Sequence, residues 1–256
     1  MTEYTDHHGP EGLRTRGTVV VVPGRGETRS AYTRLGRRLA ADAYRVRVVD
    51  APELDENDLE GSLARFGGRL TDAAEDSGAG QDGPVRPLVL LGADKGAVAL
   101  AALLGRGGAP SAVRPDGVVL AGIPGGGAAV VGGWEEELDA RTSCPAHRGA
   151  LTEDAGTRRG ALDEAVVEAL LTAAHDGGID VPALLLVGDA DPLADREALV
   201  RTATSLPRAR LAVVRDAHHD VLNDMQHRSV AAEIVTFLET LRDGLVPVVT
   251  AGPSAW

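Results

Sequence analysis

The stretch LVLLGADKGAVALAALL, residues 88–104, decides the fold. An apolar run ends at Gly92, an acid and a lysine follow, and after Gly96 an apolar pattern with helical spacing resumes. A residue on a sharp strand-to-helix turn needs small neighbours two positions away on either side, because the backbone doubles back there. Gly92 and Gly96 occupy those two positions. The spacing therefore predicts that Asp94 projects from the carboxyl edge of a sheet, where open α/β folds bind ligands.

Short apolar runs bounded by turn residues alternate with helical patterns along the chain. The runs are nearly continuous in Val and Leu, which suits strands covered on both faces. This alternation predicts an α/β fold with a mostly parallel sheet of about six or more strands and helices on both faces. We expect strands at Thr18–Val22, Val46–Val49, Pro87–Leu91, Gly117–Ala121, Ala183–Val187 and Arg210–Val214. We expect helices at Tyr32–Ala41, Leu59–Ala74, Ala97–Leu104, Arg196–Ser205 and Ser229–Leu241, with a further helical stretch at Leu162–Ala174.

The composition and net charge indicate which residues form the core and which classes of partner are excluded. The 256 residues are 43% hydrophobic and only 3% aromatic, so the core is expected to consist of Val, Leu and Ala. The formal net charge of −12 argues against nucleic acid and anionic membrane surfaces, since both need basic patches. Cys144 is the only cysteine, which excludes an intrachain disulfide. We see neither a signal peptide nor an apolar run near the roughly 20 residues of a membrane span, so a cytoplasmic location is expected.

Two glycine-rich turns carry candidate backbone donors. VVVVPGRGETRSAY ends the first strong strand, and its turn can aim the N–H of Arg25 or Gly26 at a developing oxyanion, together with the N–H of Lys95. Lys95 is also the only lysine among 26 basic residues, so its place beside the predicted elbow is less expected by chance. Its side chain could bring positive charge to the mouth of the site.

Acidic and histidine residues follow two late strands. LLLVGDADPLAD ends one strand with Asp189 and Asp191, and LAVVRDAHHDVLND ends the next with His218 and His219. The chain order of elbow, acid and histidine is that of the α/β-hydrolases.

From about residue 17 to residue 243 the chain resembles the α/β-hydrolase-fold superfamily, in particular its bacterial lipase- and esterase-like branch. In that family the elbow reads G-x-S-x-G, whereas here it reads G-A-D-K-G. The resemblance implies that Asp94 takes the nucleophile position, Asp191 the acid position and His219 the base position. It favours His219 over His218, because the histidine directly precedes DVLND. It favours Asp191 over Asp189, because the acid usually falls three residues after the glycine.

About sixty residues without an obvious strand separate the fourth and fifth predicted strands, and an insertion of that length is more often a functional lid than a connection. Trp134 in this lid is expected to line the substrate pocket, since aromatic surface is scarce, and Glu135–Glu137 is expected to start a helix or form an exposed face.

The apolar tail could be loose, cover the core or dock on another chain, so the oligomeric state stays open and includes a homodimer. The expected organisation is a flexible N-terminal segment at 1–16, a core domain at 17–124 and 182–243, a lid at 125–181 and a C-terminal tail at 244–256.

An aspartate at the elbow leaves three functions open. A carboxylate nucleophile can form an ester intermediate, as in the haloalkane dehalogenases and epoxide hydrolases of this superfamily. Their accessories fit poorly here. Lys95 stands where the dehalogenases commonly have a tryptophan, and the tyrosines that epoxide hydrolases carry in the lid lie upstream of it in this chain, at Tyr4, Tyr32 and Tyr44. A second open function is a catalytically inactive binding scaffold, and the third is acid–base chemistry by Asp94 and His219.

The favoured function keeps Asp94 and His219 as an acid–base pair without a covalent step, which contributes roughly 10²–10⁴-fold in rate. Asp94 and Asp191 on either side of one imidazole are expected to hold His219 cationic. We expect a small hydrophobic substrate and a cyclisation, C–C bond formation or lyase reaction in natural-product tailoring.

No cofactor and no metal are expected. PGRGE lacks the G-K-[ST] ending of a phosphate loop, and no histidine spacing matches a helix-borne pair such as H-E-x-x-H. The residues of NDMQHRS are instead expected to cap the last helix and to tie its start to the histidine loop: Asn223, Asp224, His227 and Arg228.

Overall fold

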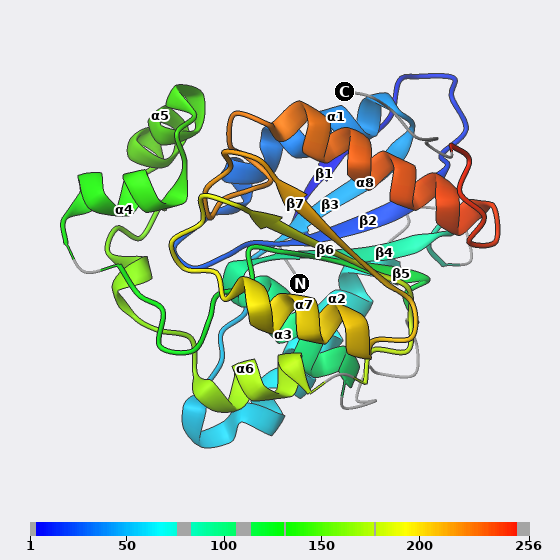
Figure 1. Ribbon diagram of the computed structural model, residues 1–256. Coiled ribbons are helices and arrows are strands. Elements are labelled where there is room, and N and C mark those ends of the chain that lie inside the picture. The colour runs from blue at the N-terminus through cyan, green and yellow to red at the C-terminus, as the bar shows by residue number, and fades with distance from the viewer. Residues whose placement is uncertain (1–3, 76–82, 106–113, 131, 177, 250–256) are drawn as a thin grey trace, which may run out of the picture.

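A seven-stranded sheet forms the centre of the computed structural model, which describes residues 4–75, 83–105, 114–130, 132–176 and 178–249 (Figure 1). The strand order is β1-β3-β2-β4-β5-β6-β7. β1 runs antiparallel to β3, and the other neighbouring pairs are parallel. The strands are β1 (Tyr4–His7), β2 (Gly17–Val22), β3 (Tyr44–Val49), β4 (Leu88–Ala93), β5 (Gly117–Ala121), β6 (Ala183–Gly188) and β7 (Ala209–Val214).

Helices cover both faces of the sheet, as the near-continuous apolar strands predict (Figure 1). Val19 and Val21 of β2 pack into the core beneath α1 and α8, and Val20 and Val22 pack into the core on the opposite face. α1 spans Thr33–Ala41 and α8 spans His227–Arg242. The opposite face carries α2 (Leu59–Glu75), α3 (Asp94–Gly105), α6 (Glu168–His175) and α7 (Arg196–Ser205).

The six predicted strands and five principal helices are confirmed, with ends shifted by three residues or fewer. β1 was not predicted and lies within the N-terminal segment expected to be flexible. Its sequence YTDH has no apolar run, and long-range contacts hold it at the edge of the sheet. Asp6 Oδ1 accepts a hydrogen bond from Arg47 Nε at 2.7 Å, and the Arg47 guanidinium lies 4.0 Å from the centre of the Tyr4 ring.

The segment expected to be a lid contains α4 (Trp134–Arg141), α5 (Pro145–Glu153), the short helix η3 (Ala161–Asp163) and α6. The helical stretch expected at Leu162–Ala174 is divided between η3 and α6, and α6 packs on α3. α4 and α5 lie beyond one end of the sheet, at the left of Figure 1. Opening and closing of this segment stays a prediction.

Two more short helices complete the described elements, η1 (Arg29–Tyr32) and η2 (Glu56–Asp58). In the part of the chain that the structure describes, every helix is too short or too polar to cross a membrane. The start of the C-terminal tail, 244–249, exposes Leu245, Val246, Val248 and Val249 and so does not cover the core.

Candidate active site

Asp94 sits on a strained turn between β4 and α3. Its φ of +46° lies in the left-handed region, which a residue with a side chain rarely adopts. The close approach of neighbouring backbone explains both glycines. A Cβ on Gly92 would lie 2.6 Å from the Ala97 nitrogen, and a Cβ on Gly96 would lie 2.5 Å from the Pro23 carbonyl oxygen. The turn therefore presents the Asp94 side chain at the carboxyl edge of the sheet, as the spacing of the glycines predicted.

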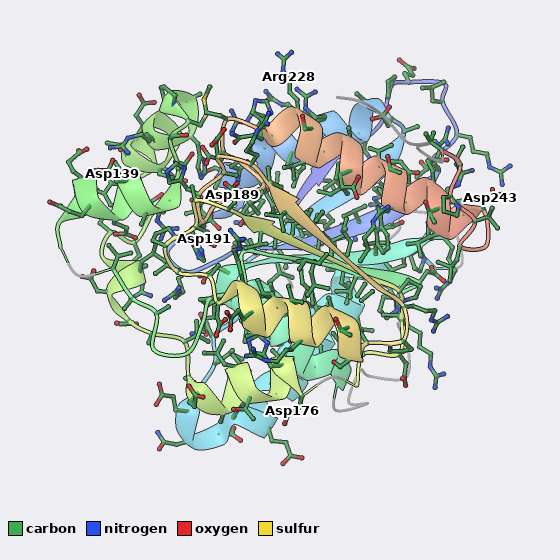
Figure 2. The ribbon with its side chains drawn as sticks, viewed as in Figure 1. Asp139, Asp176, Asp189, Asp191, Arg228 and Asp243 are labelled. Carbon is green, nitrogen blue, oxygen red and sulfur yellow. The ribbon has the colours of Figure 1, made fainter. Side chains whose placement is uncertain are left out.

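The structure brings Asp94, His219 and Asp191 together. His219 Nε2 lies 3.2 Å from Asp94 Oδ1, an ion pair whose orientation falls short of a hydrogen bond, and Nδ1 lies 3.0 Å from Asp191 Oδ2. All three residues are buried, with His219 only 2% exposed. Figure 2 shows Asp189 and Asp191 at the end of the sheet nearest α4. Asp189 contacts the Asp216 backbone instead, so Asp191 is the acid that meets the imidazole.

Arg25 holds the Asp94 carboxylate from two directions. The Arg25 backbone N–H donates to Oδ2 at 2.7 Å, and the guanidinium donates from Nε to Oδ2 at 2.9 Å and from Nη2 to Oδ1 at 2.8 Å. Both groups are buried. The backbone donor expected for an oxyanion is therefore occupied by Asp94 itself, and the clamp by the Arg25 side chain was not predicted.

The charges around His219 stabilise its protonated form. Burial alone would lower the pKa of His219, but Asp191 and Asp94 outweigh burial and raise this pKa to about 10. Burial alone would raise the pKa of Asp94, but the contact with His219 and the charge of Arg25 hold that pKa well below its usual range. The pair is therefore a carboxylate and an imidazolium at neutral pH.

The cavity beside this pair has a volume of about 10 Å³, room for about one water molecule. Its walls include Asp94, His219, Glu27, Asp220 and the apolar residues Ala93, Ala121, Val221 and Leu222. A substrate therefore needs a movement of the surrounding loops to enter.

The remaining predicted residues lie around this centre rather than in it. Gly26 adopts a φ of +72° and its carbonyl accepts the Arg158 N–H at 2.9 Å. Lys95 is half-buried, and burial lowers the pKa of its amine. Trp134 does not line the cavity beside Asp94; its indole N–H donates to Thr152 Oγ1 at 3.2 Å. The expectation that Trp134 lines the substrate pocket stays a prediction.

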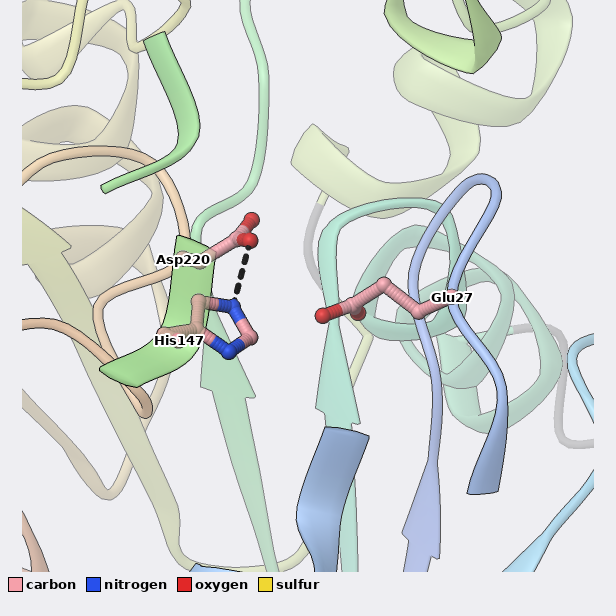
Figure 3. A group of neighbouring side chains, drawn as sticks. All are labelled: Glu27, His147 and Asp220. Atoms are coloured by element: carbon pink, nitrogen blue, oxygen red, sulfur yellow. Dashed lines mark hydrogen bonds and ion pairs between the residues drawn. The ribbon is translucent and has the colours of Figure 1, made fainter. Parts of the chain in front are cut away.

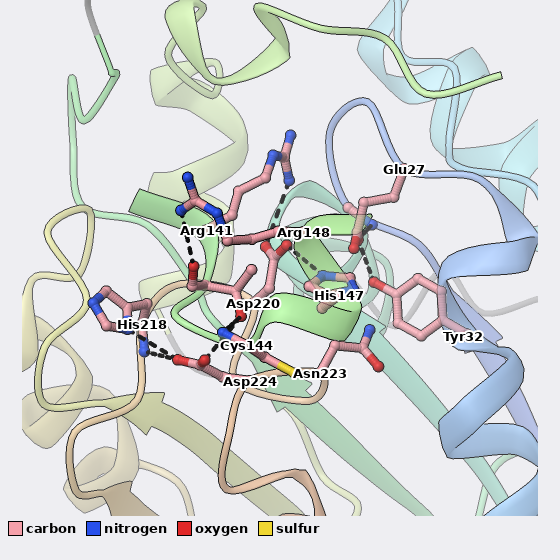
Figure 4. Close-up of polar contacts among 12 residues, drawn as sticks. Glu27, Tyr32, Arg141, Cys144, His147, Arg148, His218, Asp220, Asn223 and Asp224 are labelled. Atoms are coloured by element: carbon pink, nitrogen blue, oxygen red, sulfur yellow. Dashed lines mark hydrogen bonds and ion pairs between the residues drawn. The ribbon is translucent and has the colours of Figure 1, made fainter. Parts of the chain in front are cut away.

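A second polar cluster lies next to the first. Glu27 Oε2 accepts hydrogen bonds from the Gly24 N–H, at 2.9 Å, and from the Tyr32 hydroxyl. His147 Nε2 lies 2.9 Å from Asp220 Oδ2. Figure 4 shows Glu27 and Tyr32 on one side of His147 and Asp220 on the other. Burial and the Asp220 carboxylate raise the pKa of Glu27, whereas for Asp220 the charge of Arg141 and the contact with His147 outweigh burial and lower the pKa.

Arg141 connects the two clusters. Its guanidinium donates to Glu137 Oε1 and to the Arg25 carbonyl oxygen, at 2.8 and 2.7 Å, and lies 3.5 Å from Asp220 Oδ1. The expectation that Glu135–Glu137 starts a helix or forms an exposed face is confirmed by its first alternative, since these residues form the first turn of α4, with Glu137 buried. An arginine four residues away along α4 neutralises the buried acid.

Asp224 fastens the end of α4 to the loop that carries His219. Its carboxylate accepts hydrogen bonds from the Thr142 hydroxyl at 2.8 Å, the Ser143 N–H at 2.9 Å and the His218 N–H at 2.7 Å. The predicted tie to the histidine loop is confirmed through Asp224, but the predicted cap is wrong. Gln226 precedes α8, and its side chain does not cap the helix.

Comparisons with known proteins identify the fold but no family. No family model and no curated protein matches the chain. The monoacylglycerol lipase of Paleococcus ferrophilus is 18% identical with a TM-score of 0.70, over 94% of this chain and 99% of that chain. The monoglyceride lipase of Saccharomyces cerevisiae, crystallised as a soluble variant, is 15% identical with a TM-score of 0.69, over 93% and 91%. The enol-lactonase of Burkholderia xenovorans is 19% identical with a TM-score of 0.65, over 93% and 96%.

The chain has the α/β-hydrolase fold. Asp94, Asp191 and His219 lie in contact, as the resemblance implies, while the catalytic role of each stays a prediction. The sequence reasoning missed the Arg25 clamp and the roles of Glu27 and Asp220. The run RGE in the first turn and the run HHD in the histidine loop were the available signals, since both place charged residues at strand ends beside the elbow.

Proposed function

We propose that this α/β-hydrolase-fold chain is an enzyme that donates a proton from the His219 imidazolium to a small hydrophobic molecule and regains it from solvent, without a covalent bond to Asp94. The observation that carries the proposal is the Arg25 clamp on both carboxylate oxygens of Asp94. His219 supplies the exchangeable proton at Nε2 and Asp191 orients the ring through Nδ1. The chemistry needs no cofactor, and such positioned groups contribute roughly 10²–10⁴-fold in rate.

The clamp disfavours a covalent aspartate mechanism. A nucleophilic carboxylate needs an oxygen with a lone pair directed at the substrate, but each Asp94 oxygen accepts two hydrogen bonds from Arg25. Esterification would also remove the negative charge and leave the buried guanidinium without its partner. Unpairing one member of a buried ion pair costs about 3–5 kcal/mol.

The lining of the cavity supports a hydrophobic substrate, because Ala93, Ala121, Val221 and Leu222 form its apolar walls. A narrower form of the proposal is a cyclisation, C–C bond formation or lyase step in natural-product tailoring. It rests on the aspartate at the elbow and on the absence, from the expected sequence positions, of the tryptophan and lid tyrosines that serve the covalent enzymes.

A catalytically inactive binding scaffold is the second candidate. The cavity of about 10 Å³ favours it, because the polar groups are packed too closely to admit a substrate without movement. A scaffold and an enzyme differ in whether the imidazole exchanges protons with a bound molecule.

The test measures the exchange of an activated C–H proton of hydrophobic β-diketones in D₂O by NMR. An enzyme of the proposed kind accelerates exchange at least about 100-fold over the His219→Gln variant, whereas the His218→Gln control keeps the wild-type rate. Equal rates in the wild type and His219→Gln would contradict the proposal and favour the scaffold. A second arm incubates the protein with an ester, an epoxide and a haloalkane in ¹⁸O water, and ¹⁸O in the peptide that contains Asp94 would establish the covalent mechanism instead.

A further inference from the structure

Three buried side chains from distant parts of the chain meet beside the proposed catalytic pair. Glu27 comes from the turn after β2, His147 from α5 and Asp220 from the loop that carries His219. Each offers one ligand atom, and these atoms all lie within 4.8 Å of one another. Figure 3 shows the Glu27 carboxylate directed across a short gap at the His147 ring and Asp220.

The second observation is an unpartnered oxygen. Glu27 is only 8% exposed, and its Oε1 is buried with no hydrogen-bond partner among the described residues. Oε2 is fully engaged by the Gly24 N–H and the Tyr32 hydroxyl. A buried carboxylate oxygen without a partner costs free energy.

The surrounding charges also favour a cation. Buried carboxylates outnumber buried guanidinium groups around the two clusters, and even an imidazolium at His219 leaves an excess of negative charge. A divalent ion would offset this excess, which is costly in a buried site. The buried acids are Glu27, Asp94, Glu137, Asp191 and Asp220, and the buried arginines are Arg25 and Arg141.

We propose that Glu27 Oε1, His147 Nε2 and Asp220 Oδ2 bind one divalent first-row transition-metal ion, for which Zn²⁺ fits the donor set best. Zn²⁺ accepts one imidazole and two carboxylates, whereas Ca²⁺ requires six to eight oxygen ligands. Tetrahedral bonds of about 2.1 Å place ligand atoms about 3.4 Å apart. His147 Nε2 and Asp220 Oδ2 lie 2.9 Å apart and would separate slightly, whereas Glu27 lies within 4.8 Å of them and would approach by up to about 1.4 Å. The side chain of Glu27 has three rotatable bonds and can supply that movement.

Outer contacts of the kind that support metal ligands are already in place. The Tyr32 hydroxyl and the Gly24 N–H orient Glu27, and Arg141 lies 3.5 Å from the Asp220 oxygen that would not bind the ion. The cavity lined by Glu27 and Asp220 is also lined by Asp94 and His219, so the ion would lie next to the proposed catalytic pair. The ion would join α5 to the first turn and to the histidine loop.

The experiment titrates Zn²⁺ into chelator-treated, full-length protein by calorimetry and repeats the titration with Co²⁺ by visible absorption. We expect about one ion per chain and the intense visible band of low-coordinate Co²⁺. The variants Glu27→Gln and His147→Gln should each weaken binding by about 100-fold or more, since loss of an outer-shell partner alone costs about 10–100-fold. Two controls leave the affinity unchanged: His218→Gln, a partly exposed histidine paired with Asp224, and Asp139→Asn, an exposed acid of α4.

Zn K-edge X-ray absorption of the wild-type protein keeps the proposal testable if a variant fails to fold. One imidazole with oxygen ligands and no sulfur is the expected shell, whereas sulfur would place the ion at Cys144 and overturn the proposal. Binding well below one ion per chain would overturn it too, and so would binding that survives Glu27→Gln or fails in His218→Gln. The proton-transfer proposal does not route a step through this ion, so the proton-exchange assay decides it separately.

Discussion

Removing the Arg25 guanidinium should destabilise the protein more than removing any exposed arginine. Arg25→Met keeps the apolar stem but removes one of the two cationic partners of the buried Asp94 carboxylate, the other being His219. Breaking a buried pair on one side costs about 3–5 kcal/mol. In a protein of this size, about 2–4 °C of melting temperature corresponds to 1 kcal/mol, so we expect Tm to fall by about 6–20 °C.

The matched control is Arg148→Met, because Arg148 pairs with Glu135 and Asp139, whose side chains are 76% and 75% exposed. Exposed pairs contribute about 0–1 kcal/mol, so this variant should unfold close to the wild type. Urea unfolding gives the free energies of unfolding, and Asp94→Asn completes a double-mutant cycle. We expect a coupling energy of about 1–3 kcal/mol between positions 25 and 94. An Arg25→Met variant as stable as the control, or strictly additive effects, would show that the clamp does not stabilise Asp94.

Three further predictions concern the tie, the elbow and the nucleophile position. Hydrogen bonds outweigh burial and lower the pKa of Asp224 to about 2. A lowered pKa stabilises the fold above the unfolded-state pKa near 3.8, so about 2 kcal/mol of the free energy of unfolding should be lost as the pH falls from about 4 towards 2. Unfolding curves of the wild type and of Asp224→Asn should therefore converge at that low pH. Gly96→Ala should unfold the protein or cost several kcal/mol, because its Cβ would meet the Pro23 carbonyl oxygen. The control Gly68→Ala in α2 meets nothing within 4 Å and should be neutral or stabilising by up to about 1 kcal/mol. Thermal melts of the two variants measure both effects. Asp94→Ser alone should hydrolyse nitrophenyl esters at the background rate, because the Arg25 guanidinium stays beside the new hydroxyl without its carboxylate partner. Rapid hydrolysis by this variant would contradict the role given to the Arg25 clamp.

The features predicted from sequence are those with local signals. The inner strands were found because strands covered on both faces are continuous in Val and Leu, and the elbow was found because backbone crowding demands Gly92 and Gly96. β1 was missed because its order comes from the pairing of Asp6 with Arg47, 41 residues away. No local pattern records such a contact.

The polar contacts of the site were missed for the same reason. An arginine in a glycine-rich turn reads as solvent-exposed, and only the fold shows that Arg25 meets an acid 69 residues later. His147 and Asp220 are 73 residues apart, so their contact has no sequence spacing that could be recognised. Asp224 was placed at the start of α8 as a cap, but three donors from two other segments compete for its oxygens.

The contacts between α4 and the loop that carries His219 link the entry of a molecule to the orientation of the His219 imidazole. Besides the Asp224 contacts, the His219 N–H donates to the Ala140 carbonyl at 3.2 Å and the Asp220 N–H donates to the Arg141 carbonyl at 2.8 Å. Any outward swing of α4 that admits a molecule must therefore pull on the imidazole or break these bonds first. If α4 does move, the contact between Asp94 and His219 that we propose for proton transfer would be misaligned in the open form and would be restored only after closure around the bound molecule.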